Sequence, residues 1–193
     1  MGEGPNNPIA GLEAVVARSA ARAPAPVESW NPPYCGDIGL RIGSDGTWYY
    51  QESPIGRAEL VSLFARVLRR DADGRTYLVT PAEKVLITVD DAPFVAVALE
   101  VLGAGRGQML VMRTNVDDTV VCGPEHPLRF VASPPDDGLK PYLLVRGRLE
   151  ALLRRSLYYD LVALAVTERG DDGQDALGVW SSGQFFPLAA AAP

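Results

Sequence analysis

The chain has 193 residues, of which 47% are hydrophobic, so it is long enough to bury one large core or two small ones. Its net charge of −6 argues against general binding to nucleic-acid polymers or anionic lipid, so any anion site must be local. Cys35 and Cys122 lie far apart and His126 is the only histidine, so neither a zinc site nor a disulfide framework is expected. Because no apolar stretch is long enough to cross a bilayer and the start lacks the pattern of a signal peptide, a cytoplasmic location is expected.

Residues 1–29 are predicted to form an N-terminal extension. Residues 12–21 are rich in helix formers, and Pro24 and Pro26 cannot continue a helix because proline lacks the amide donor. A β-hairpin then follows, with strands at 38–42 and 47–51. Its turn contains Asp45-Gly46, a pair that tolerates the positive φ angles of a tight turn.

The first unit, residues 30–92, is predicted to contain one main helix. Ser53 is a suitable N-cap and Pro54 suits the first helical position, so the helix should begin there and run to about Leu68 with an apolar stripe along one face. Strands at 77–80 and 85–89 complete a β-β-α-β-β order.

The second unit, residues 93–193, is predicted to be larger and richer in strands. Strands are expected at 94–102, 109–113, 119–121 and 128–131, then a loop at 134–138, a helix at 142–157, a buried strand at 160–167, a turn at 170–173, and a hairpin around Ser182 and Gly183.

A pattern of one arginine followed by leucines at the same spacing occurs at 57–68 and again at 146–157, which suggests a duplicated unit. Both units also place strands before and after a helix. We therefore expect an α+β protein of two related, mostly antiparallel units, each with one main helix and with strongly curled sheets or partial barrels.

Several short blocks occur in order along the chain: Asp45-Gly46-Thr47-Trp48, Ser53-Pro54-Ile55-x-Arg57, Thr80-Pro81-Ala82-Glu83-Lys84, Val89-Asp90-Asp91-Ala92-Pro93-Phe94, Thr114-Asn115, Pro141-Tyr142 and Trp180-Ser181. With these blocks, the chain from about Trp30 to its C-terminus resembles the bacterial domain-of-unknown-function family 1285. The resemblance implies a duplicated core, a second domain superficially like pleckstrin-homology folds, and a nucleotide-type ligand at the domain interface, with a role in signalling. It implies no reaction.

Arg57 and Arg146 fall near the first turns of the two predicted helices, where cations are disfavoured because a helix N-terminus is partially positive. A bound anion would explain such an arginine. The alternatives are an ion pair with Glu83, Asp90 or Asp91, or a solvated side chain.

The remaining candidate residues supply groups that suit a nucleotide-type ligand. Lys84 with the two arginines would hold phosphate, Asp91 and Asn115 would bond polar edges, and Trp48 or Tyr142 would stack on a base. Glu83 is a further candidate. Each also has a structural reading, because 80–84 and Asn115 suit turns and the aromatic side chains suit a core.

Three classes of function remain open. The first is a regulatory protein that binds a small anionic ligand between its units, with a signalling protein as a possible partner and no cofactor identified. The second is a protein-interaction adaptor that needs no small molecule. The third is an enzyme that uses Glu83, Asp90 or Asp91 with a divalent metal. A Ser-His or Cys-His hydrolase is not expected, because the single histidine lies in a polar loop.

Overall fold

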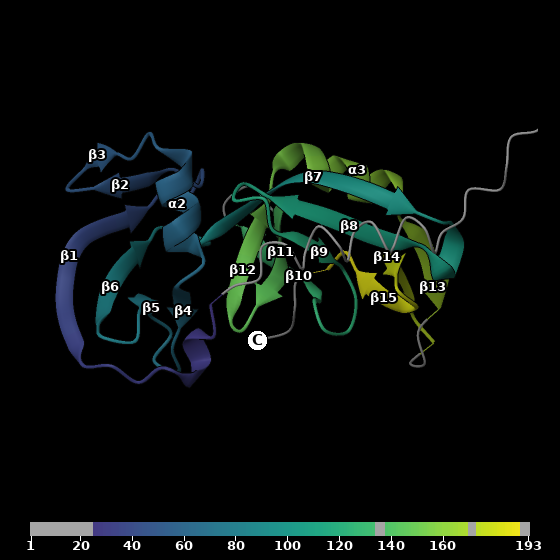
Figure 1. The fold of residues 1–193 in the computed structure, drawn as a ribbon. Helices are drawn as coiled ribbons and strands as arrows, with labels where there is room; N and C mark the ends of the chain where they lie inside the picture. Colours follow the sequence, from purple (N-terminus) through teal and green to yellow (C-terminus); the bar gives the residue numbers. More distant parts are fainter. Residues whose placement is uncertain (1–24, 134–137, 170–172, 190–193) are drawn as a thin grey trace, which may run out of the picture.

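A computed structural model of the chain describes residues 25–133, 138–169 and 173–189. The helix predicted at 12–21, and most of the loop at 134–138 and the turn at 170–173, lie outside these residues. Within them the chain is α+β, as expected, with two six-stranded, mostly antiparallel sheets and a helix with each (Figure 1). A third, small sheet is present in addition.

The first unit contains one six-stranded sheet in the order β3-β2-β1-β6-β5-β4. Its helix, α2, lies on the side that faces the second unit (Figure 1). In chain order its elements are the 3₁₀ turn η1 (Val27–Ser29), β1 (Tyr34–Ile42), β2 (Trp48–Tyr50), β3 (Ser53–Pro54), α2 (Ala58–Ala65), β4 (Leu68–Arg70), β5 (Thr76–Val79) and β6 (Lys84–Val89).

The second unit contains a six-stranded sheet in the order β10-β11-β12-β7-β8-β9 and the small sheet β13-β14-β15. Helix α3 packs against β7 and β14. In chain order its elements are β7 (Phe94–Leu102), the 3₁₀ turn η2 (Gly105–Gly107), β8 (Met109–Thr114), β9 (Thr119–Val121), β10 (Leu128–Ser133), β11 (Gly138–Arg146), β12 (Leu149–Leu153), α3 (Arg155–Ala163), β13 (Val166–Arg169), β14 (Asp175–Ser181) and β15 (Gln184–Pro187).

The two six-stranded sheets share one topology. In each, the first three strands and the last three strands form antiparallel meanders, and the first and last strands pair in parallel at the centre: β1 with β6, and β7 with β12. Strands β7 to β12 of the second sheet thus correspond one by one, in chain order, to strands β1 to β6 of the first, and they have the same neighbours. The units are therefore related in their strand connections.

Two glycines bend β1, which Figure 1 shows as a strongly curved strand. Its pairing with β6 shifts register twice between Tyr34 and Leu40. Gly36 and Gly39 lie at these shifts with φ of +95° and +77°, in the left-handed region that glycine adopts most easily. Local breaks in the ladder thus curl the sheet.

The first helix is shorter than predicted at both ends. Gln51 and Glu52 both have positive φ, 47° and 63°, and form a two-residue turn, so Ser53–Pro54 pairs back onto β2 as β3 instead of capping a helix. At the other end, Leu68–Arg70 leaves the helix and pairs with β5.

The helix predicted at 142–157 is wrong. Gly147, with φ of +51°, ends β11, and the chain returns as β12. The burial of Leu149, Ala151 and Leu153 alternates with that of the residues between them, which is the two-residue period of a strand. Helix α3 begins only at Arg155 and runs to Ala163, so the strand predicted at 160–167 is also wrong except at its end.

The arginine–leucine pattern therefore does not mark equivalent elements. Its first copy covers α2 and the start of β4, whereas its second covers a strand hairpin and the start of α3. The duplication is visible in the sheet topology, and the pattern that suggested it is a coincidence of composition.

Candidate functional site

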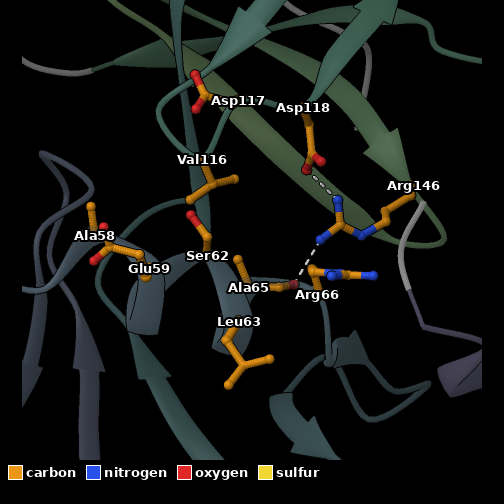
Figure 2. Close-up of a pocket in the computed structure, with 10 residues that line it drawn as sticks. All are labelled: Ala58, Glu59, Ser62, Leu63, Ala65, Arg66, Val116, Asp117, Asp118 and Arg146. Atoms are coloured by element: carbon orange, nitrogen blue, oxygen red, sulfur yellow. Dashed lines mark hydrogen bonds and ion pairs between the residues drawn. The ribbon is translucent and has the colours of Figure 1, made fainter. Parts of the chain in front are cut away.

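Arg146 joins the two units. It ends β11 in the second unit, pairs with Asp118, and donates a 2.7 Å hydrogen bond to the carbonyl oxygen of Ala65 in the last turn of α2 (Figure 2). Its guanidinium also lies 4.7 Å from the ring centroid of the buried Phe94. Because the C-terminal carbonyls of a helix lack partners within the helix, a cation suits this place.

The groove beside Arg146 does not favour an anion. It has a volume of about 440 Å³ and lies between α2 and the segment that carries Asp118 (Figure 2). Glu59, Asp117 and Asp118 supply carboxylates to its lining, and Asp118 already neutralises Arg146. The partner of Arg146 is thus Asp118, and none of the acidic residues proposed from the sequence.

Arg57 is the N-cap residue of α2, as its predicted place near a helix start requires. Its side chain is exposed, and no hydrogen bond or ion pair holds it among the residues that the structure describes. It lines neither the groove beside Arg146 nor the larger cavity that is described below. The two arginines selected from the sequence therefore do not share a cleft.

Asn115 and Trp48 are held in the body of the protein. The side chain of Asn115 accepts a hydrogen bond from the amide of Val95 and donates one to the carbonyl oxygen of Gly46, so it fastens the β1–β2 turn of the first unit to the second unit. Trp48 is 1% exposed and packs against Phe64 of α2, so its ring is not available for stacking on a ligand.

Glu83 and Lys84 lie in and after the turn that precedes β6, as their sequence predicts. The hydroxyl of Thr80 accepts hydrogen bonds from the backbone amides of Ala82 and Glu83, and Glu83 is exposed. Lys84 pairs with Asp71 at 3.1 Å. Burial opposes ionisation of Asp71, but hydrogen bonds from Arg69 and Lys84 outweigh it and lower the pKa of that carboxyl.

The adjacent aspartates Asp90 and Asp91 have partners in different units. Asp90 accepts from Arg41 at 2.7 Å, whereas Asp91 accepts from Lys140 and from the hydroxyl of Tyr142, both at 2.7 Å. Burial, and then the bond to Asp91, raise the pKa of the Tyr142 phenol. Tyr142 is only 8% exposed, so it too is a core residue.

A second hollow, of about 680 Å³, lies where the β1–β2 turn of the first unit meets β11, β12 and α3 of the second. Lys140, Arg154 and Arg155 line it, and Asp45 is the one carboxylate among the described lining residues. We refer to it as the cation-lined cavity. Tyr158 and Tyr159 also line it, and the other described lining residues are Ser44, Val95, Ser133, Gly138, Leu139, Pro141, Leu152 and Leu153.

The start of α3 provides two of the three cations of this cavity, Arg154 and Arg155, and β11 provides Lys140. Arg154 is the N-cap residue, no side chain caps the first turn, and the first turn carries no acidic residue. Arg154 is exposed and has no partner among the described residues, whereas the Nε of Arg155 donates to the hydroxyl of Tyr159 at 2.9 Å. Cations therefore gather at a helix end that is itself partially positive.

None of the eight candidate residues from the sequence lines the cation-lined cavity, although Lys140 touches one of them, Asp91. Sequence reasoning missed Arg154 and Arg155 because it began the second helix at Tyr142. The argument that an arginine at a helix start suggests a bound anion would have selected Arg154, had Gly147 been recognised as a strand turn.

Asp45 keeps its charge within the cavity lining. The backbone amide and then the hydroxyl of Thr47 donate hydrogen bonds to this carboxylate, which lowers its pKa. Among the residues that the structure describes, the cavity lining therefore presents three cations and one fixed negative charge to a ligand.

Other chemistry finds less support in the described parts of the chain. They contain no group of three or more histidine, cysteine or acidic side chains arranged to hold a metal ion. Cys122 is buried, and its burial raises the pKa of the thiol to about 12, so it is not a nucleophile at neutral pH. Neither described helix has the length and hydrophobicity needed to span a bilayer.

Comparisons with known proteins place the chain in a family. Residues 25–92 match the model of the N-terminal domain of unknown function 1285 (DUF1285), and residues 93–188 match the C-terminal domain of the same family, described as a protein of unknown function. The comparison with curated proteins finds no match.

Two solved structures are similar to this one. A DUF1285 family protein from Silicibacter pomeroyi is 48% identical, with a TM-score of 0.81, over 91% of this chain and 94% of that chain. A DUF1285 family protein from Shewanella baltica is 26% identical, with a TM-score of 0.51, over 65% of this chain and 91% of that chain. Since both domain models match and together cover most of the sequence, the chain belongs to the DUF1285 family.

Proposed function

We propose that this protein is a regulatory protein that binds a small anionic ligand of the nucleotide type in the cation-lined cavity. The observation that supports this most is the charge of the described lining residues, which include three cations and one carboxylate in a chain whose net charge is −6. Such a local excess of cations attracts phosphate groups although the molecule as a whole repels them.

The two tyrosines give the cavity a second kind of contact. Tyr158 is partly buried, and Tyr159 is 55% exposed and lies beside Arg155. An exposed ring beside a phosphate-binding cation can stack on a nucleobase, which contributes about 1–3 kcal/mol per base. These tyrosines take the stacking role that the sequence suggested for Trp48 and Tyr142.

The position of the cavity connects binding to regulation. Ser44 and Asp45 belong to the β1–β2 turn of the first unit, and the cations belong to the second. A ligand that contacts both units binds best in one relative orientation of them, and so shifts the population toward it. That shift is the signal that a partner protein would read.

The test is a thermal-shift screen of nucleotides, cyclic nucleotides and dinucleotides, followed by titration of each hit. A ligand at a hundred times its Kd should stabilise the protein by about 2.7 kcal/mol. In the double variant R154A/R155A we expect this stabilisation to be lost. The matched control is Arg57→Ala, which removes an exposed N-cap arginine outside the cavity and should bind like the parent protein.

Equal binding by R154A/R155A and the parent protein would contradict this assignment of the site. A flat screen with folded protein would instead favour the interaction adaptor, and capture of partner proteins would become the next experiment.

A further inference from the structure

Asp90 and Asp91 are consecutive residues in the segment that connects the two units. Asp90 anchors this segment to the first unit, and Asp91 anchors it to the second. The Asp90 carboxylate pairs with Arg41 of β1 in the first unit, and the Asp91 carboxylate pairs with Lys140 of β11 in the second. The side chain of Asp91 is 13% exposed, so water screens its ion pair less than that of Asp90, whose side chain is 38% exposed. The hydroxyl of Tyr142 is the other donor to Asp91.

Lys140 belongs to this anchor and also to the cation-lined cavity. Its ammonium lies 2.7 Å from an Asp91 oxygen, and its side chain, which belongs to the cavity lining, is 45% exposed. A lysine ammonium is a single point charge on a flexible stem, so it can turn toward either of two anions. An anion in the cavity and the Asp91 carboxylate thus compete for the same cation.

We propose that Lys140 is a shared cation through which an anion in the cavity weakens the Asp91 anchor and loosens the segment between the units. The proposal rests on the proposed function, because it requires an anion in that cavity. It adds to that function the contact that responds to ligand binding, which is the ion pair between Lys140 and Asp91. Since coupling between two equilibria is reciprocal, loss of the Asp91 charge must strengthen anion binding by the same factor as anion binding weakens the anchor.

The experiment measures the Kd of adenosine triphosphate and of inorganic pyrophosphate by calorimetry in the full chain. Asp91→Asn should tighten binding by about two- to fivefold, the size expected for release of an ion pair whose lysine is about half exposed. Lys140→Gln should weaken binding. The combined variant D91N/K140Q should bind like K140Q alone, because the effect of Asp91 acts through the lysine.

The matched control is Asp90→Asn, which removes the same charge from the neighbouring residue. Asp90 pairs with Arg41, which keeps Glu52 as a second partner at 2.9 Å, and neither aspartate lines the cavity. We expect its Kd to match the parent protein. Equal tightening in D90N, or tightening by D91N that persists in the K140Q background, would show a general effect of charge and would overturn the proposal.

Hydrogen–deuterium exchange provides a second readout that does not depend on the fold of D91N. Adding adenosine triphosphate to the parent protein should raise exchange at the amide of Asp90, which donates a hydrogen bond to the carbonyl oxygen of Ile42, and K140Q should show no such rise. Unchanged exchange in the parent protein overturns the proposal.

The two hypotheses fail in different ways. If the parent protein binds neither probe and no member of the nucleotide screen, or if R154A/R155A binds as tightly, the proposed function fails and the coupling fails with it. If binding is present and is lost in R154A/R155A but D91N leaves the Kd unchanged, only the coupling is wrong.

Discussion

Arg146 satisfies three groups that no other described side chain reaches together: the Asp118 carboxylate, the Ala65 carbonyl at the end of α2, and the Phe94 ring. Arg146 and Asp118 are only 17% and 18% exposed at their side chains, so water replaces little of what is lost. We expect Arg146→Met to lower the free energy of unfolding by about 3 kcal/mol, because it leaves Asp118 without a cation. Urea unfolding measures this change.

The control for Arg146→Met is Arg57→Met, which removes an exposed arginine without a partner among the described residues. It should change stability by less than about 0.5 kcal/mol. A comparable loss in both variants would show that the cost comes from net charge and has no source in the Arg146 contacts.

At the scale of single residues, sequence reasoning identified types of side chain better than it identified their partners. It placed Arg57 at a helix start and predicted a turn at Asn115 correctly. It could not find that Asn115 meets Gly46 or that Arg146 meets Asp118, because these contacts join residues that are distant in the chain. Such partners depend on how two sheets dock, which no local pattern encodes.

At the scale of elements, Gly178 holds the hairpin of β14 and β15 together. A Cβ at this position would lie 2.4 Å from Cζ of Phe185 and 2.5 Å from the carbonyl oxygen of Phe186, closer than atoms can approach. Gly178→Ala should therefore cost about 1–3 kcal/mol and loosen the small sheet. Hydrogen exchange of the β14 amides, together with urea unfolding, would detect both effects.

Gly56 provides the matched control, because a Cβ there meets nothing within 4 Å and its φ is not in the left-handed region. Gly56→Ala should leave stability unchanged or raise it by up to about 1 kcal/mol, since alanine restricts the unfolded chain. A β14 that stays protected in G178A would mean that the hairpin has room to adjust.

The predicted strands were mostly confirmed. Of the two helices predicted within the described residues, the first was correct except at its boundaries, whereas the second was placed on a strand hairpin. Residues 149–153 combine leucine, alanine and glutamate, which all favour a helix, with a spacing that also fits alternate burial. Parallel pairing with β7 decides between the two, and this tertiary contact outweighs the helix propensity. The turn at Gln51 and Glu52 was missed because neither residue is a usual choice for positive φ.

At the scale of the whole molecule, the β1–β2 turn is one of the places where the units dock. Gly46 has φ of +84°, and a Cβ there would lie 2.6 Å from Nδ2 of Asn115 and 3.0 Å from Cγ2 of Val95. We expect Gly46→Ala to displace Asn115 and to separate the unfolding of the two units, so that calorimetry shows a broadened or double transition.

Gly74→Ala is the control for the strain of a left-handed alanine. Gly74 has φ of +79° and nothing within 4 Å of its Cβ position. The free energy of unfolding of Gly74→Ala should fall by about 1 kcal/mol, and calorimetry should still show a single unfolding transition. The free energy of unfolding of Gly46→Ala should fall by at least about 1 kcal/mol more. If both variants unfold alike, the contact of Gly46 with Asn115 does not hold the units together.

The parallel pairing of the first and last strands also determines when each sheet can be completed during synthesis. β1 pairs with β6 in the middle of the first sheet, so the two three-stranded halves of this sheet cannot join until Val89 has left the ribosome. The second sheet has the same requirement at Leu153. Pairs so distant in sequence close slowly, because a long loop must be ordered before any ladder bond forms. In each unit, pairing of the first strand with the last is therefore a late folding step. The first sheet is completed before the second during synthesis.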